Sequence, residues 1–191
     1  MQDHVQKMMI AVFGRDRPGI VARVSGLLAT MGCNIEDATQ TILHSRFAGM
    51  FVFQPQAESL STGDVLHALE QGFAGEELTF WVSLLDDATT AQSGDAGQPA
   101  APFVITTIGP DQVGLVAGIT EVLFRFGVNI TALRANVKTE DASQWVMIYE
   151  VDVPQQVDRK QFREALYGRA QELRQILSLQ HRSIFEAVHR V

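Results

Sequence analysis

The sequence contains a single cysteine, Cys33, which excludes an internal disulfide framework. No apolar run reaches the roughly 18 residues that a membrane-spanning helix needs, and residues 1–7 are too polar for a secretory signal. Acidic residues outnumber basic ones by 22 to 15, so the chain lacks the positive footprint of nonspecific nucleic-acid binding. We therefore expect a cytoplasmic protein that contacts neither nucleic acid nor membranes directly.

Sequence motifs of catalysis are also missing. There is no glycine-rich dinucleotide or phosphate loop, no serine nucleophile elbow and no zinc-protease helix motif. The five histidines are scattered without an i, i+4 pair, which argues against a metal site. Cys33 follows Gly32, and a similar stretch later in the chain has Val128 in its place. Cys33 is therefore interpreted as a packing residue. The sequence therefore predicts no catalytic residue, no metal and no cofactor.

An internal repeat is what the sequence does contain. Residues 14–35, GRDRPGIVARVSGLLATMGCNI, align without a gap with residues 109–130, GPDQVGLVAGITEVLFRFGVNI, and nine of the 22 positions are identical. In both copies apolar residues recur at i, i+1, i+4, i+7, i+8 and i+11, which is the pattern of one helix face. The offset of 95 residues is too long for a solenoid repeat and fits two homologous domains.

Each copy predicts the same order of elements, β-α-β-β-α-β, which is typical of a ferredoxin-like α+β domain with an antiparallel sheet and both helices on one face. The first helix of each copy is expected directly after the aligned turn. The second helix is expected at about residues 62–73 in the first copy and 158–175 in the second. In the third strand of the second copy, the period of two places five residues on one face: Trp145, Met147, Tyr149, Val151 and Val153. The expected strands are 8–13, 34–43, 49–54 and 78–85, then 103–108, 129–137, 144–153 and 178–183.

The predicted domains are 1–85 and 102–191. Residues 86–101, DDATTAQSGDAGQPAA, contain no large apolar side chain and are interpreted as a flexible linker. Residues 183–191, SIFEAVHRV, have no counterpart after the first copy and are interpreted as a short docking segment.

The turn before each first helix admits a purely structural interpretation. Asp16 and Asp111 precede the helix start and would cap its free N–H groups. Pro18 would fit the first helical turn, and Gly19 and Gly114 would allow a close backbone approach.

A functional interpretation uses the same groups. A helix N-terminus with exposed N–H groups binds anions, so this turn could hold the carboxylate of a free amino acid. The ammonium group could be bound by Asp16, by Asn34 at the start of the second strand, or by strand carbonyls. The two copies could each supply half of such a site, and Asp16 with Asn34 is the favoured pair.

The stretch DRPGIVARVSGLLATMGCNIED resembles ACT domains, in the form found in the glycine cleavage system transcriptional repressor group, formyltetrahydrofolate deformylases and some phosphoserine phosphatases. The resemblance covers about residues 8–85 and 103–182. It implies an amino-acid site at a domain–domain interface, built from the first strand–helix turn and the start of the second strand. By position, the implied residues are Asp16, Arg17, Pro18, Gly19, Ile20, Asn34 and Ile35, and Asp111, Gln112, Val113, Gly114, Asn129 and Ile130. The second copy departs from the motif, with Gln112 in place of Arg17 and Val113 in place of Pro18, which favours the first turn.

The expected function is that of a non-catalytic regulator. It would sense glycine or another small amino acid, act through a protein partner such as a transcription regulator, and form a homo-oligomer. The alternative is an interaction or dimerisation module without a ligand. A third reading, an enzyme, is disfavoured because the linker and termini are too short for a catalytic domain.

Overall fold

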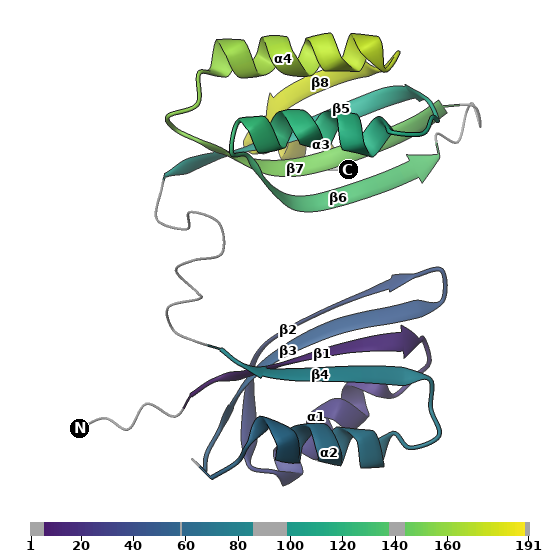
Figure 1. Cartoon of the computed structure of the whole chain (residues 1–191), viewed down its shortest axis with the longest axis vertical. Coiled ribbons are helices and arrows are strands. Elements are labelled where there is room, and N and C mark those ends of the chain that lie inside the picture. The colour runs from purple at the N-terminus through teal and green to yellow at the C-terminus, as the bar shows by residue number, and fades with distance from the viewer. Residues whose placement is uncertain (1–5, 58, 86–98, 138–143, 190–191) are drawn as a thin grey trace. The chain divides into compact units, whose positions relative to one another are not determined.

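The computed structural model describes residues 6–57, 59–85, 99–137 and 144–189, with side chains described as far as 185. The chain divides into two compact units, Met1–Ser93 and Gly94–Val191, each an antiparallel sheet with helices (Figure 1). Most of the predicted linker, residues 86–98, lies outside the described residues. Its last two residues, Ala100 and Ala101, belong to a strand.

The first domain follows the predicted β-α-β-β-α-β order, and its sheet has the strand order β2-β3-β1-β4 with antiparallel neighbours. This arrangement makes β1 and β2 parallel, so they begin at the same end of the sheet. The elements are β1 (Met8–Arg15), α1 (Ile20–Thr30), β2 (Cys33–Leu43), β3 (Arg46–Pro55), α2 (Thr62–Gly72) and β4 (Leu78–Leu84).

The second domain repeats this topology with the order β6-β7-β5-β8. It ends in an additional helix, α5, that the first domain lacks among its described residues. The elements are β5 (Ala100–Pro110), α3 (Leu115–Arg125), β6 (Asn129–Val137), β7 (Gln144–Pro154), α4 (Arg159–Glu172), β8 (Ile176–His181) and α5 (Arg182–His189). None of the helices in the described part of the chain is long and apolar enough to cross a membrane.

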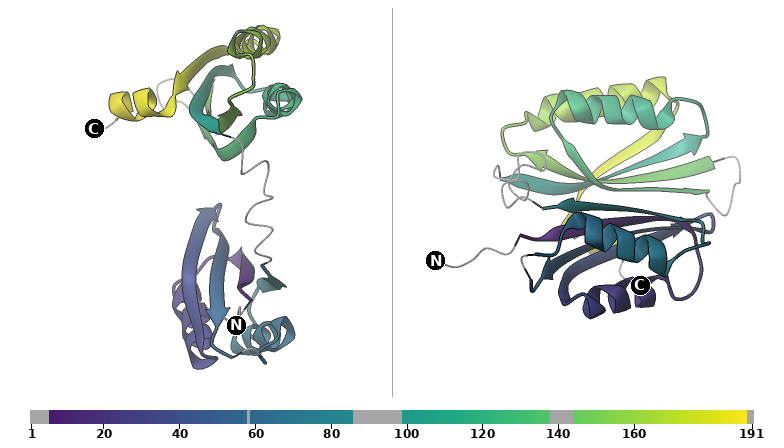
Figure 2. Two further views of the ribbon diagram at one scale, coloured as in Figure 1. Left: turned by 90° about the vertical axis from the view of Figure 1, so that its left-hand side faces the viewer. Right: turned by 60° about the horizontal axis from the view of Figure 1, so that its bottom comes forward.

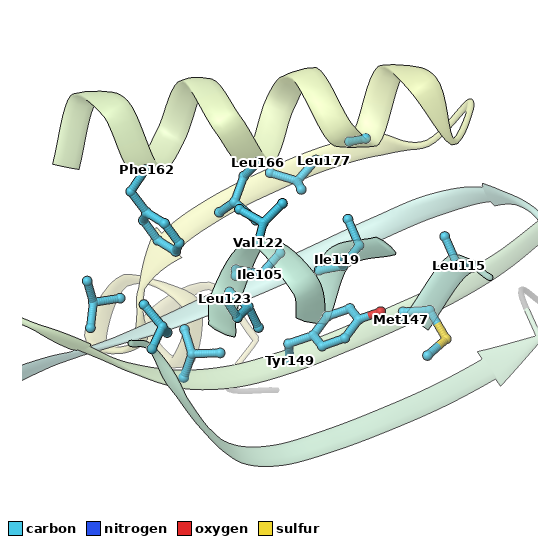
Figure 3. Packing of buried hydrophobic residues seen from close by; sticks show 14 residues of the cluster. Ile105, Leu115, Ile119, Val122, Leu123, Met147, Tyr149, Phe162, Leu166 and Leu177 are labelled. Carbon is cyan, nitrogen blue, oxygen red and sulfur yellow. The ribbon is translucent and has the colours of Figure 1, made fainter. Parts of the chain in front are cut away.

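Helices α1 and α2 cover one face of the first sheet, and α3 and α4 cover one face of the second (Figure 2). Each domain has its own hydrophobic core. In the second domain Met147, Tyr149, Val151 and Val153 are buried on one face of β7, as the period of two predicts. Figure 3 shows Met147 and Tyr149 in this core. In the first domain Ile20, Val24 and Leu28 form the buried stripe of α1. The repeated apolar pattern therefore encodes two separate cores.

The two domains fill the gap between their helices in opposite ways. In the first, Arg23 of α1 reaches across to the carbonyl of Gly72 at the end of α2, and a side chain at Gly72 would lie 2.6 Å from Leu27 of α1. In the second, the arginine is Arg169 of α4, and the glycine is Gly118 of α3, whose added Cβ would lie 2.9 Å from the Arg169 Nε. The arginine and the glycine have exchanged helices.

Candidate functional site

The turns before α1 and α3 differ from the predicted capped structure. The N-cap residues are Gly19 and Gly114, with φ of 96° and 89°, and no side chain caps either helix. The predictions that Asp16 and Asp111 cap these helices and that Pro18 occupies the first helical turn are therefore wrong. The physical reason is that both glycines adopt the left-handed conformation and occupy the N-cap position, which leaves each aspartate three residues too early to cap the helix.

Each turn is tied to the rest of its domain. The Asp16 N–H donates to the carbonyl of Ser45 in the β2–β3 hairpin (2.9 Å), and the Arg17 side chain pairs with Glu76, which also pairs with Arg23 (2.6 Å). In the second domain Gln112, aligned with Arg17, donates to the carbonyl of Leu173. Both positions therefore anchor the turn to the connection that follows the second helix.

The uncapped helix starts are the part of the turn that is open to a ligand. Pro18 and Gly19 are exposed, as are Val113 and Gly114. The first N–H groups of α1 and α3 have no side-chain acceptor, and the N-terminus of a helix favours an anion. The Asp16 carboxylate is half-buried beside the turn and has no side-chain partner among the described residues.

Asn34 lies far from Asp16 within the first domain. Asn34 pairs with Gln54, next to the row that joins Phe53 to Met8 at the start of β1. Asp16 follows the other end of this eight-residue strand, so the two residues lie roughly 26 Å apart at about 3.3 Å per residue. One small amino acid cannot contact both residues of the same domain, and Asp111 and Asn129 are separated in the same way by β5.

The isoleucines of the implied site are packing residues. Ile20 is buried in the first core, and Ile35 and Ile130 are half-buried against the first and second cores. Cys33 also contacts the first core, and burial raises the pKa of its thiol, which is the opposite of what a nucleophile needs.

Sequence reasoning missed Glu76 and Arg23, which hold the first turn through Arg17. Arg23 also stacks on the Phe73 ring at 4.1 Å. The repeat gave no signal for Arg23, since this residue aligns with Gly118. Gly14 aligns with Gly109, and this pair indicates only a close backbone approach that both domains share. A Cβ at Gly14 would lie 2.0 Å from the carbonyl of Glu77. The described residues contain no group of three His, Cys, Asp or Glu side chains that could hold a metal ion.

Both halves of the chain match the same known domain. Residues 6–82 and 101–180 both match the ACT domain. The chain belongs to the ACT domain family. This tandem ACT protein is thus built from two copies of one domain, as the resemblance of its repeated motif implied.

Individual relatives match one domain or both. A UPF0237 protein of Methanopyrus kandleri is 40% identical over 72 residues, which is 38% of this chain and 78% of that protein. A structure of an unknown protein from Galdieria sulphuraria superimposes with a TM-score of 0.74 at 22% identity, covering 92% of this chain and 98% of the other. A second structure, provisionally named a glycine cleavage system transcriptional repressor, gives a TM-score of 0.61 at 20% identity and covers 92% and 96%. These two structures share the tandem fold.

Proposed function

We propose that this tandem ACT protein is a non-catalytic, cytoplasmic regulator that senses glycine or another small amino acid and acts through a protein partner. The observation that carries the proposal is the pair of uncapped helix starts behind Gly19 and Gly114. Backbone N–H groups there would bind the carboxylate of the amino acid, and the half-buried Asp16 carboxylate would contribute to binding its ammonium group.

The proposed site needs two ACT domains. Asp16 and Asn34 stand at opposite ends of one domain, so the turn of one domain would meet the second-strand start of another at an interface. Binding would favour one packing of the two domains over another, and a partner would read that difference. The proposed ligand and role are also in keeping with the name of the glycine cleavage repressor structure that shares the fold.

The test is a thermal-shift panel of the twenty amino acids on the full chain. A ligand that binds only the folded state stabilises it by about 2.7 kcal/mol at 100 times its Kd, which raises the Tm by several degrees, at roughly 2–4 °C per kcal/mol. We expect glycine or another small amino acid to give this shift.

Variants locate the site. Asp16→Ala is expected to remove most of the shift, because it removes the proposed ammonium partner. The matched control is Glu70→Ala, which deletes an equally charged, exposed side chain on α2 and should keep the shift. No shift from any of the twenty amino acids at millimolar concentration would sink the sensor proposal and favour the alternative, an interaction module without a ligand.

A further inference from the structure

The first sheet presents a largely apolar surface on the side away from α1 and α2, and the middle of this surface is uncharged. We call it the outer face of the first sheet. The side chains of this face alternate with core residues along each strand, and the strand registers arrange them in rows. The two central rows are Thr39–Met50–Ala11–Trp81 and Thr41–Ala48–Phe13–Thr79.

Large apolar side chains in these rows are exposed. Phe13, Met50 and Trp81 retain 57%, 47% and 56% of their accessible surface, and they border a hollow of about 420 Å³. Single exposed apolar residues are ordinary, but a contiguous patch with an aromatic centre marks an interaction surface.

The corresponding face of the second sheet is covered in part by a helix. There α5 contacts β5 and β8 on the side opposite α3 and α4 (Figure 2). Val104 is only 2% exposed although it belongs to neither core cluster. Arg182 at the start of α5 binds Thr131 Oγ1 (3.1 Å) and Glu150 (3.5 Å). The first sheet has no such helix among the described residues.

Charges on the outer face of the first sheet are confined to its two ends and have opposite sign. The end beside the first turn carries Arg15, Arg46 and Glu77, a net charge of +1, with Arg46 4.0 Å from Glu77. The other end carries Asp37, together with the Lys7–Glu36 ion pair (2.7 Å), a net charge of −1.

We propose that the outer face of the first sheet binds the same face of a second copy of this chain, with the two β1 strands antiparallel. A two-fold axis through the patch brings each face onto its own equivalent, and aligned sheet-on-sheet packing suits two faces of this kind. The antiparallel orientation sets the Arg15 end of one copy over the Asp37 end of the other. The parallel orientation would oppose like charges.

A second copy fits this face better than a charged partner. Each chain carries a net charge of −7, so two copies repel except where their contact surface is neutral. The central rows hold eight uncharged residues. A basic or acidic partner would find no matching field there.

Sedimentation velocity of the full chain over a range of concentrations tests the pairing. We expect a dimer of twice the 21.0 kDa chain mass, and Met50→Lys should weaken dimerisation at least tenfold by placing a charge in the central rows. The matched control is Val21→Lys, which adds the same charge on the exposed side of α1, on the other side of the sheet, and should leave the dimer unchanged. Circular dichroism checks that both variants are folded.

Charge reversals test the orientation. Arg15→Asp and Asp37→Arg should each weaken the dimer severalfold, and the double variant should restore it. A monomer at all concentrations, or a dimer indifferent to Met50→Lys, would overturn the proposed interface. A double variant as weak as the single ones would overturn the antiparallel orientation. None of these readouts depends on amino-acid binding, so the dimer and the sensor can fail separately.

Discussion

Tyr149 carries one of the buried polar groups that have no hydrogen-bond partner among the described residues. Its side chain is fully buried in the second core, its hydroxyl is directed toward Met147 (Figure 3), and that hydroxyl has no hydrogen-bond partner among the described residues. The matching residue of the first core is Phe51, since Ile105 pairs with Tyr149 as Ile10 pairs with Phe51. A buried hydroxyl without a partner costs about 1–3 kcal/mol.

Tyr149→Phe is therefore expected to raise the free energy of unfolding by about 1 kcal/mol. The first domain supplies the precedent for phenylalanine at this position. Urea denaturation monitored by circular dichroism measures the change, with the reciprocal variant Phe51→Tyr as the control, which should destabilise. A loss of stability in Tyr149→Phe would indicate that the hydroxyl has a hydrogen-bond partner.

Stability at high pH depends on the same residue. Burial raises the pKa of Tyr149 to about 12 from an ordinary value of 10. Between pH 10 and 12 the unfolded chain has lost this proton while the folded chain keeps it, so stability falls by about 1.4 kcal/mol per pH unit. Denaturation curves at pH 9 to 12 should show this slope in the natural protein and a shallower one in Tyr149→Phe. Equal slopes would contradict the assignment.

At the scale of the element, the helix starts fall into two kinds. The second helix of each domain has a side-chain cap: Ser61 and Asp64 form a capping box on α2, and the Asp158 carboxylate accepts from the N–H groups of Lys160 and Gln161 on α4 (2.8 and 3.1 Å). The first helix of each domain starts at a left-handed glycine and has none. The second helices are capped by side chains from their own sequence, whereas the first N–H groups of α1 and α3 have no side-chain acceptor.

This difference predicts unequal effects of two aspartate substitutions. Asp158→Ala removes a cap and should cost about 1 kcal/mol of stability. Asp16→Ala removes no cap and should change the stability of the ligand-free protein by less than about 0.5 kcal/mol. Thermal or urea unfolding of both variants decides the matter, and equal losses would restore the capping interpretation of Asp16.

The sequence predicted the elements better than their ends. Apolar periodicity placed every strand and the four repeated helices, and Gly32 and Gly127 end α1 and α3 with φ of 69° and 63° as expected. It failed at the start of the first helices, because Asp two or three residues before a helix looks like a cap whether or not a glycine intervenes. The Arg17–Glu76 pair was unpredictable, since it joins segments 59 residues apart that only the tertiary fold brings together.

At the scale of the whole molecule, the two cores share no residue. We therefore expect Leu69→Ala and Leu166→Ala, matched positions on α2 and α4, to act on different domains. Each should cost about 2–5 kcal/mol in its own domain. Hydrogen exchange read by mass spectrometry should show faster exchange in the strands of the affected domain, while the other domain keeps its protection.

That outcome would be contradicted by equal deprotection of both domains in either variant, which would mean that they unfold as one unit.

The tandem organisation was predictable from the repeat because duplication preserves apolar spacing. The two-domain character of the proposed site was readable only in part. The repeat aligns Asp16 with Asp111 and Asn34 with Asn129. Only the pairing of the strands shows that the aspartate and the asparagine lie at opposite ends of each domain.

The exchange of arginine and glycine between helices limits how the two copies can be recombined. In a chimaera that combines α1 with α4, Arg23 and Arg169 would compete for one gap, and like charges would meet at short range. The converse combination of α3 with α2 would leave two glycines and an unfilled gap. Helix pairs would have to be transplanted together, so the two copies, although descended from one pattern, have ceased to be interchangeable in their parts.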